Sequence, residues 1–190
     1  MANNTNMIKV WDPLLRLFHW SLVLFFFVAY LGDVDRLVLH SYSGYAIGLL
    51  LLFRLVWGFI GSQYARFSSF LVAPNVVWSY LKAILNGDAR RYIGHNPAGA
   101  LMIVVLTIGL VVTVLSGMSL VAMEGSGPLA NTFVAVLPAS VMVPVHEFSS
   151  DFMAVMVIVH IAGAVLSSKI HRENLVLAMV TGYKKRNHKK

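Results

Sequence analysis

The chain has 190 residues, of which 58% are hydrophobic and only 12% are charged. A soluble domain normally carries about a quarter of its residues as charged ones, so this composition predicts a protein embedded in lipid. The chain has no cysteine, which excludes disulfides, iron-sulfur clusters and thiolate metal sites. No glycine-rich phosphate loop follows a strand pattern, so the sequence offers no nucleotide site.

Four apolar runs have the length of about 20 residues that a helix needs to cross the hydrocarbon core. A helix satisfies its own backbone hydrogen bonds in lipid, so each run is expected to be a helix. Asp12 with Pro13, and Asn96 with Pro97, are typical helix starts before the first and third runs. A secretory signal is the alternative for the first run, but its start is weakly basic and no A-x-A-like site follows Tyr30. The expected spans are residues 14–30, 37–59, 98–121 and 145–168.

A shorter amphipathic segment lies between the second and third spans. Residues 74–85 carry one apolar stripe and precede Gly87, a typical helix stop. The stripe consists of Val76, Val77, Tyr80, Leu81 and Ile84. This pattern predicts a short helix lying on the membrane surface and covering the bundle.

Lysine and arginine are distributed unevenly between the connections. They gather before the first span, between the second and third spans, and in residues 169–190, whereas residues 122–144 contain none. The positive-inside rule therefore puts both termini of this multi-pass protein in the cytoplasm. This topology explains the net charge of +7 without a nucleic-acid partner, because a basic tail after a last span usually meets anionic lipid. The fold class expected is an all-α, integral membrane four-helix bundle, N-in and C-in, in one domain over residues 1–190, with 169–190 as a basic cytoplasmic tail.

Four histidines, His19, His40, His146 and His160, fall in or at the edges of the spans. Ionisable groups are costly in lipid, so each is a functional candidate, although any one alone could be a neutral histidine bonded to a helix neighbour. His146 and His160 are 14 residues apart, which returns to within roughly 40° of the same helix face. Their separation along the axis is about 21 Å, too far for one metal or one haem. They are therefore expected to serve two stacked sites.

The predicted topology pairs these histidines by depth. His19, early in the outward-running first span, is level with His160, late in the inward-running fourth span. His40 and His146 are level near the outer face. Two imidazoles at each of two depths suit two haem b groups, each ligated on both sides of the iron, whereas zinc would want four ligands together. Such ligation fills both axial positions, so simple electron transfer is the expected chemistry.

The second span carries two supporting residues on the face of His40. Gly44 leaves room for a bulky macrocycle. Arg54 lies 14 residues from His40, at the depth of the inner pair, where no span has an acidic residue. A haem propionate would supply the anion that a buried guanidinium needs, although snorkelling of Arg54 to the interface is the alternative.

Three further histidines are interpreted more simply. His95 and His188 are expected to be solvated in the loop and the tail. His171 continues the inward face of the fourth span and is expected to be a surface residue at its end. The alternative is that His171 bonds a propionate or lines a quinone pocket.

The sequence resembles the bacterial di-haem cytochrome b family, which includes cytochrome b561, the b-type cytochrome subunits of nickel-iron hydrogenases and, more distantly, those of formate dehydrogenases. The resemblance covers nearly the whole chain. It rests on Val10-Trp11-Asp12-Pro13 with Phe18-His19-Trp20, on His40 with Gly44, on Arg54 to Gly61, on Gly94-His95-Asn96-Pro97, on His146-Glu147, on His160 to Gly163, and on His171 to Leu175.

Membership would imply one haem toward each face, ligated by His19, His40, His146 and His160. It would also imply an electron conduit between ubiquinone or menaquinone and a periplasmic redox protein, such as a c-type cytochrome or a hydrogenase. The alternative is a stand-alone quinone-linked oxidoreductase acting on a small molecule such as superoxide, so whether the chain is itself an enzyme stays open. A histidine-containing proton or metal transporter without haem is a third hypothesis.

Overall fold

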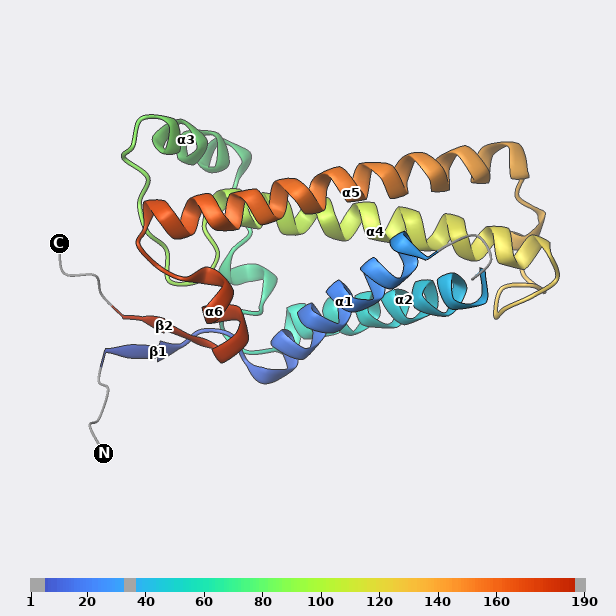
Figure 1. The fold of residues 1–190 in the computed structure, drawn as a ribbon, viewed down its shortest axis with the longest axis horizontal. Helices are drawn as coiled ribbons and strands as arrows, with labels where there is room; N and C mark the ends of the chain where they lie inside the picture. The colour runs from blue at the N-terminus through green and yellow to red at the C-terminus, as the bar shows by residue number, and fades with distance from the viewer. Residues whose placement is uncertain (1–5, 33–36, 187–190) are drawn as a thin grey trace. The chain divides into compact units, whose positions relative to one another are not determined.

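The computed structural model describes residues 6–32 and 37–186, and the regular structure in this part consists of helices and one small antiparallel sheet (Figure 1). The long helices are α1 (Pro13–Leu31), α2 (Leu37–Ile60), α4 (Pro97–Met123) and α5 (Ala139–Ile170). The shorter elements are β1 (Met7–Lys9), α3 (Pro74–Leu85), α6 (Leu175–Thr181), β2 (Tyr183–Lys185) and two 3-10 turns at Phe67–Ser69 and Phe133–Val136.

The long helices match the four expected spans, and all four are long and apolar enough to cross a membrane. Large hydrophobic side chains point outward along them, as at Leu24, Leu49 and Ile158, which are 60%, 69% and 67% exposed. A surface this apolar is what lipid requires, so the chain is an all-α, multi-pass membrane protein.

The start of α5 differs from expectation, because the helix begins at Ala139 rather than at residue 145. Pro144 was interpreted as part of the preceding connection, but it lies inside the helix. Proline lacks an N–H and so removes only one backbone hydrogen bond here, close to the helix start where some N–H groups lack helical partners in any case. The residues around Pro144 are mostly apolar, so the helix can extend over six more residues at its start than expected.

The chain divides into two compact units, and each long helix contributes to both. Unit 1 consists of Met1–Leu17, Leu55–Val104 and Val159–Lys190, and unit 2 of Phe18–Arg54 and Val105–Ile158. The predicted histidine pairs are therefore distributed unequally: His19, His40 and His146 belong to unit 2, and His160 belongs to unit 1.

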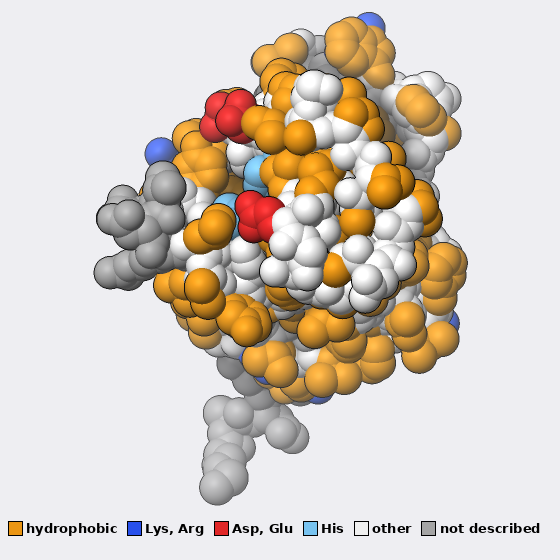
Figure 2. Space-filling model, turned by 90° about the vertical axis from the view of Figure 1, so that its right-hand side faces the viewer, with side chains coloured by type: hydrophobic (Ala, Val, Ile, Leu, Met, Phe, Trp, Pro, Cys, Tyr) orange, Lys and Arg blue, Asp and Glu red, His pale blue; other side chains and the backbone are white. Residues whose placement is uncertain are grey.

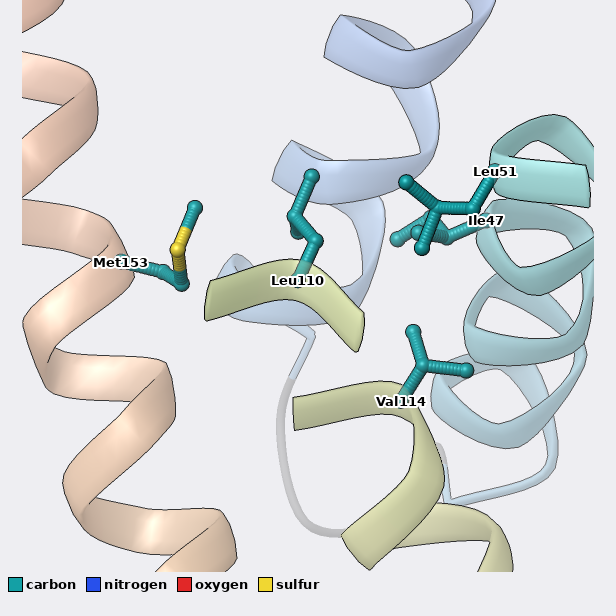
Figure 3. Packing of buried hydrophobic residues seen from close by; sticks show 5 residues of the cluster. All are labelled: Ile47, Leu51, Leu110, Val114 and Met153. Atoms are coloured by element: carbon teal, nitrogen blue, oxygen red, sulfur yellow. The ribbon is translucent and has the colours of Figure 1, made fainter. Parts of the chain in front are cut away.

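Unit 2 is a four-helix bundle with a buried apolar core. Ile47 and Leu51 of α2, Leu110 and Val114 of α4, and Met153 of α5 are all at most 9% exposed, and Figure 3 shows their side chains between these helices. From α1, Leu22, Phe25 and Phe26 pack against the same cluster. A methyl group at Gly109 would lie 2.4 Å from the Met153 sulfur, so the missing side chain at this glycine allows the close packing of α4 and α5.

In unit 1, the first and last described segments pair with each other. β1 and β2 are antiparallel, with Met7 opposite Lys185 and Lys9 opposite Tyr183 (Figure 1). The N–H groups of Val10 and Trp11 donate to the Gly182 carbonyl at 2.8 and 3.1 Å. Residues 175–185, interpreted from the sequence as part of a basic tail, therefore form ordered structure.

The two helix starts expected from the sequence are confirmed. Asp12 accepts a hydrogen bond from the Leu15 amide at 2.9 Å, and Asn96 accepts one from the Gly99 amide at 2.8 Å. The second carboxylate oxygen of Asp12 accepts from the Ser62 hydroxyl at 2.6 Å and from the Trp57 indole at 3.3 Å. Burial raises the pKa of Asp12, but these hydrogen bonds, with that of Ser62 the strongest, outweigh burial and hold the pKa below its usual value.

α3 has the predicted bounds, Pro74–Leu85. Tyr80 is buried, and Val77, Leu81 and Ile84 are half-buried, so most of the predicted stripe faces unit 1, whereas Val76 is exposed. On the other side of α3, the Lys82 ammonium lies 5.5 Å from the centre of the exposed Trp78 ring. Such an exposed aromatic and cationic face suits the membrane interface where the sequence places this helix.

Candidate functional site

His40 and His146, the pair predicted to be level near the outer face, lie next to each other in unit 2. His40 is in the first turn of α2 and His146 is near the start of α5. Their ring centroids are 5.9 Å apart and their planes are nearly perpendicular, at 80°. Residues 106 positions apart in the sequence are thus brought into one site.

Each of these imidazoles is held by a backbone carbonyl. The Nδ1 atom of His40 lies 2.9 Å from the carbonyl oxygen of Ala29, and that of His146 lies 2.9 Å from the carbonyl oxygen of Thr113. A carbonyl oxygen can only accept, so Nδ1 carries the proton in both rings. Nε2 then keeps its lone pair, which is the arrangement in which histidine usually binds a metal.

A largely apolar pocket adjoins the two histidines, with about 670 Å³ of space that protein atoms do not fill, part of it open to the outside. Gly44 lines it, and a methyl group built there would meet nothing within 4 Å, so the space expected at this glycine exists. Gly117 lines the pocket on α4. A methyl group at Gly117 would lie 2.8 Å from the Cε1 atom of His146, so the ring position depends on this glycine.

One polar atom of the pocket lacks a partner in the part of the chain that the structure describes. The hydroxyl of Tyr45 is buried and forms no hydrogen bond there. It lies so close to Gly127 that a side chain at Gly127 would collide with it. A buried donor of this kind normally needs an acceptor, and a carboxylate of a bound cofactor could supply one.

These residues fit a haem. Two imidazole Nε2 atoms are free to ligate, the walls are mostly apolar, and glycines open the space between helices. Within residues 6–32 and 37–186, no three His, Cys, Asp or Glu side chains converge as they would around a bare metal ion. A pair of imidazoles, by contrast, is the set of ligands that a porphyrin iron accepts at its axial positions.

Figure 2 shows the end of the molecule on the right of Figure 1. Histidine side chains are visible there in a hollow bordered by hydrophobic and acidic side chains. Glu147, which follows His146 in α5, is among the exposed residues of unit 2. The pocket beside His40 and His146 is also partly open, so a group bound in it would be accessible from outside the helices.

The predicted inner pair is divided between the two units. His19 lies in α1 within unit 2, where its ring makes an edge contact with Trp20 at 5.2 Å between centroids. His160 lies in α5 within unit 1. Their pairing stays a prediction from depth. Arg54 is only 4% exposed, which speaks against the alternative that its head group snorkels to the interface.

The interpretation of His95 as a solvated residue is wrong. Its ring packs between Trp11 and Phe70, with centroid distances of 4.5 and 4.9 Å. A lone histidine in a connection carries no periodic signal, so the sequence alone did not reveal this aromatic stack in unit 1. His188, the other histidine interpreted as solvated, lies outside the described residues.

His171 follows α5 as expected, but it is half-buried and not simply a surface residue. Its Nε2 atom lies 3.4 Å from the Tyr80 hydroxyl of α3. Burial lowers the pKa of His171; the negative charge of Glu173 opposes this, and the positive charges of Arg91 and Lys184 lower the pKa further.

Beside His171, unit 1 contains an ionic cluster that the sequence analysis missed. The Glu173 carboxylate lies 2.8 Å from the Arg91 guanidinium and 3.2 Å from the Lys184 ammonium. Lys184 is only 4% exposed, and its ammonium lies 3.4 Å from the Tyr92 carbonyl. Lys184 looked like one of several tail charges in the sequence. Only the pairing of β1 with β2 shows why it is buried.

Long lipid-exposed helices and a pair of facing imidazoles beside an apolar pocket define a class: membrane proteins that hold a haem between their helices. The profile of the prokaryotic cytochrome b561 family matches residues 10–182, so the chain belongs to this family. It is a b-type cytochrome of bacterial membranes, and the resemblance found in the sequence is confirmed.

The similar curated proteins are named "Probable Ni/Fe-hydrogenase B-type cytochrome subunit". The one from Azotobacter vinelandii is 29% identical over 161 residues, covering 76% of this chain and 66% of that protein. The one from Cupriavidus necator is 28% identical over 162 residues, covering 76% and 65%. The one from Bradyrhizobium diazoefficiens is 26% identical over 158 residues, covering 75% and 64%. The chain thus spans just under two thirds of the length of these relatives. No solved structure matches the chain.

Proposed function

We propose that the chain holds two haem b groups and carries electrons across the bacterial inner membrane, between the quinone pool and a redox protein on the periplasmic side. The observation that carries this proposal is the His40 and His146 pair, whose Nδ1 atoms both bond to backbone carbonyls at 2.9 Å. This arrangement prepares both rings to ligate through Nε2.

The outer haem would be held by His40 and His146. Gly44 and Gly117 leave space for it, and the hydroxyl of Tyr45 would donate to one of its carboxylates. The bound group supplies one-electron chemistry at iron. The protein would fix the tautomer of both ligands and surround the site with mostly apolar side chains.

The inner haem would be held by His19 and His160, which the sequence places at one depth. Arg54 would pair with a propionate of this haem. Its burial at 4% exposure supports the assignment, because a guanidinium away from water needs an anion nearby.

The redox partners follow from the family. Ubiquinone or menaquinone would exchange electrons at one side, and a periplasmic protein such as a c-type cytochrome or a hydrogenase at the other. The curated names of the relatives support a hydrogenase-like partner. The partly open pocket beside His40 and His146 also leaves a second candidate function, a stand-alone quinone-linked oxidoreductase acting on a small molecule such as superoxide.

The test is a haem count per chain on purified protein, together with a reduced-minus-oxidised visible spectrum and a redox titration. We expect two b-type haems with two resolvable potentials. One haem per chain would contradict the inner or the outer site, and no haem would contradict the proposal as a whole. Reduction of a quinone by a small reductant, without any partner protein, would favour the second candidate function.

A further inference from the structure

We propose that Ser116 is a positioning residue for His146 and sets the reduction potential of the outer haem. This inference rests on the proposed ligation by His146. Ser116 lies on α4 in unit 2 and is 4% exposed. Its hydroxyl oxygen is 3.2 Å from the Nδ1 atom of His146, the ring nitrogen other than the proposed ligand atom Nε2.

The proton of the Ser116 hydroxyl is already engaged. The hydroxyl oxygen lies 2.8 Å from the Val112 carbonyl and 3.0 Å from the Thr113 carbonyl, and both can only accept. A serine in a helix commonly donates to the carbonyl four residues earlier, which is Val112 here. Toward His146 the hydroxyl therefore presents a lone pair.

The histidine side of the contact leads to the same assignment. The Thr113 carbonyl is 2.9 Å from the same Nδ1 atom, so Nδ1 must carry a proton to avoid two facing lone pairs. This proton is then shared between the Thr113 carbonyl and the Ser116 hydroxyl. For His40, the corresponding atom has the Ala29 carbonyl as its partner. The two ligands thus differ by one acceptor, and that acceptor is a side chain that can be replaced.

The second acceptor has a direct chemical consequence. An acceptor on the N–H of a ligating imidazole increases the electron density on the ring and makes it a more basic ligand. A more basic ligand stabilises ferric iron more than ferrous iron. Ser116 therefore lowers the potential of the outer haem, and its burial prevents bulk water from replacing the lost bond.

The test is a redox titration of purified Ser116→Ala protein with both haems bound. We expect the outer haem to be reduced at a higher potential, with roughly a threefold to tenfold shift in its ferrous-to-ferric ratio; tenfold is about 59 mV for one electron. The inner haem should keep its potential. The haem that His40→Ala protein loses identifies the outer one.

Two variants separate positioning from general packing. Ser119→Ala is the matched control, because Ser119 is a buried serine of the same helix whose hydroxyl donates to the Val134 carbonyl at 3.0 Å. It should leave both potentials unchanged. Ser116→Thr keeps the hydroxyl and should restore the potential, and its ferric electron paramagnetic resonance signal should match that of the unmodified protein.

An unchanged potential in Ser116→Ala protein that retains both haems would overturn this inference alone. So would an equal shift in the Ser119→Ala control. If Ser116→Ala protein fails to fold, the inference then depends on Ser116→Thr, and an outer-haem potential that differs from that of the unmodified protein contradicts it. If His146→Ala protein retains both haems, the proposed ligation itself is wrong.

Discussion

His40 and His146 show how far a candidate haem site depends on the backbone. The carbonyls that fix their tautomers belong to Ala29 and Thr113, whose side chains carry no chemical signal of this role. The pairing of the two histidines could be predicted from helical rise and topology. The acceptors could not, because they depend on how neighbouring helices lie against each ring.

Replacing ligands in pairs tests the two levels. We expect His40→Ala and His146→Ala each to lose the same haem, and His19→Ala and His160→Ala each to lose the other, because an axial position left empty releases the group. Haem content and redox titration of each purified variant measure this. Loss of one and the same redox centre in His19→Ala and His40→Ala would contradict the assignment by depth.

Arg54→Leu tests the propionate contact. If Arg54 pairs with a propionate of the proposed inner haem, removing its positive charge disfavours reduction, so the inner potential should fall, by roughly the 59 mV that corresponds to a tenfold change in a one-electron equilibrium. The outer potential should stay nearly constant. Arg66→Leu is a suitable control, because Arg66 bonds to the Gly61 carbonyl within unit 1. Equal shifts of both haems would exclude a local contact.

At the scale of elements, the helices and the small sheet differ in how far the sequence predicts them. α1, α2 and α4 lie within two residues of the expected spans because hydrophobicity and helix-start residues agree at their ends. β1 and β2 could not be predicted, because a strand of three residues has almost no pattern and this pair joins opposite ends of the chain. Burial of Lys184 follows from that pairing, and its charge alone would predict exposure.

The ionic cluster makes the packing of β2 dependent on pH. Burial raises the pKa of Glu173, but the hydrogen bond from Arg91 and the charge and hydrogen bond of Lys184 outweigh it, so the pKa is lowered. Burial lowers the pKa of Lys184, with Glu173 opposing. Both groups bind a proton more readily in the unfolded chain than in the folded one, so the free energy of unfolding rises with pH where either group titrates. The contribution of Glu173 to the free energy of unfolding is present above its ordinary pKa of about 4.3. It is lost as the pH falls through the lowered pKa that Glu173 has in the folded state.

Hydrogen exchange of the amides in Tyr183–Lys185 measures this dependence. After correction for intrinsic rates, protection should decrease as the pH falls from 6 to 3, because the Glu173 carboxylate becomes protonated in this range. Glu173→Gln should lower the free energy of unfolding by about 3 kcal/mol at pH 7, because it leaves two cations without their anion. This loss should become smaller as the pH is lowered. Asp88→Asn, at an exposed position of unit 1, is the matched control. A pH-independent cost of Glu173→Gln would contradict an ionic origin.

At the scale of the whole molecule, the direction of the chain in the membrane is a prediction from charge. Lysine and arginine are absent from residues 122–144, between α4 and α5, and frequent from Lys169 onward. The proposed orientation therefore places both chain ends in the cytoplasm and the connection from α4 to α5 outside.

Reporter fusions test this orientation. A fluorescent protein fused after residue 190 should mature and fluoresce, because it folds in the cytoplasm. Alkaline phosphatase inserted after Gly125 should be active, because it needs an oxidising compartment for its disulfides. The reciprocal fusions should be inactive. Phosphatase activity at the carboxyl end would reverse the assignment of inner and outer haems.

The composition of unit 1 has a consequence for biosynthesis. It assembles from the beginning, the middle and the end of the chain, and β1 obtains its partner strand from residues 183–185. While the ribosome is still adding the last helix, Met7–Lys9 has no partner and Arg91 has no Glu173. Unit 1 can therefore be completed only once residues 183–185 have left the ribosome, and a chain that stops before Tyr183 would leave Met7–Lys9 without its partner strand.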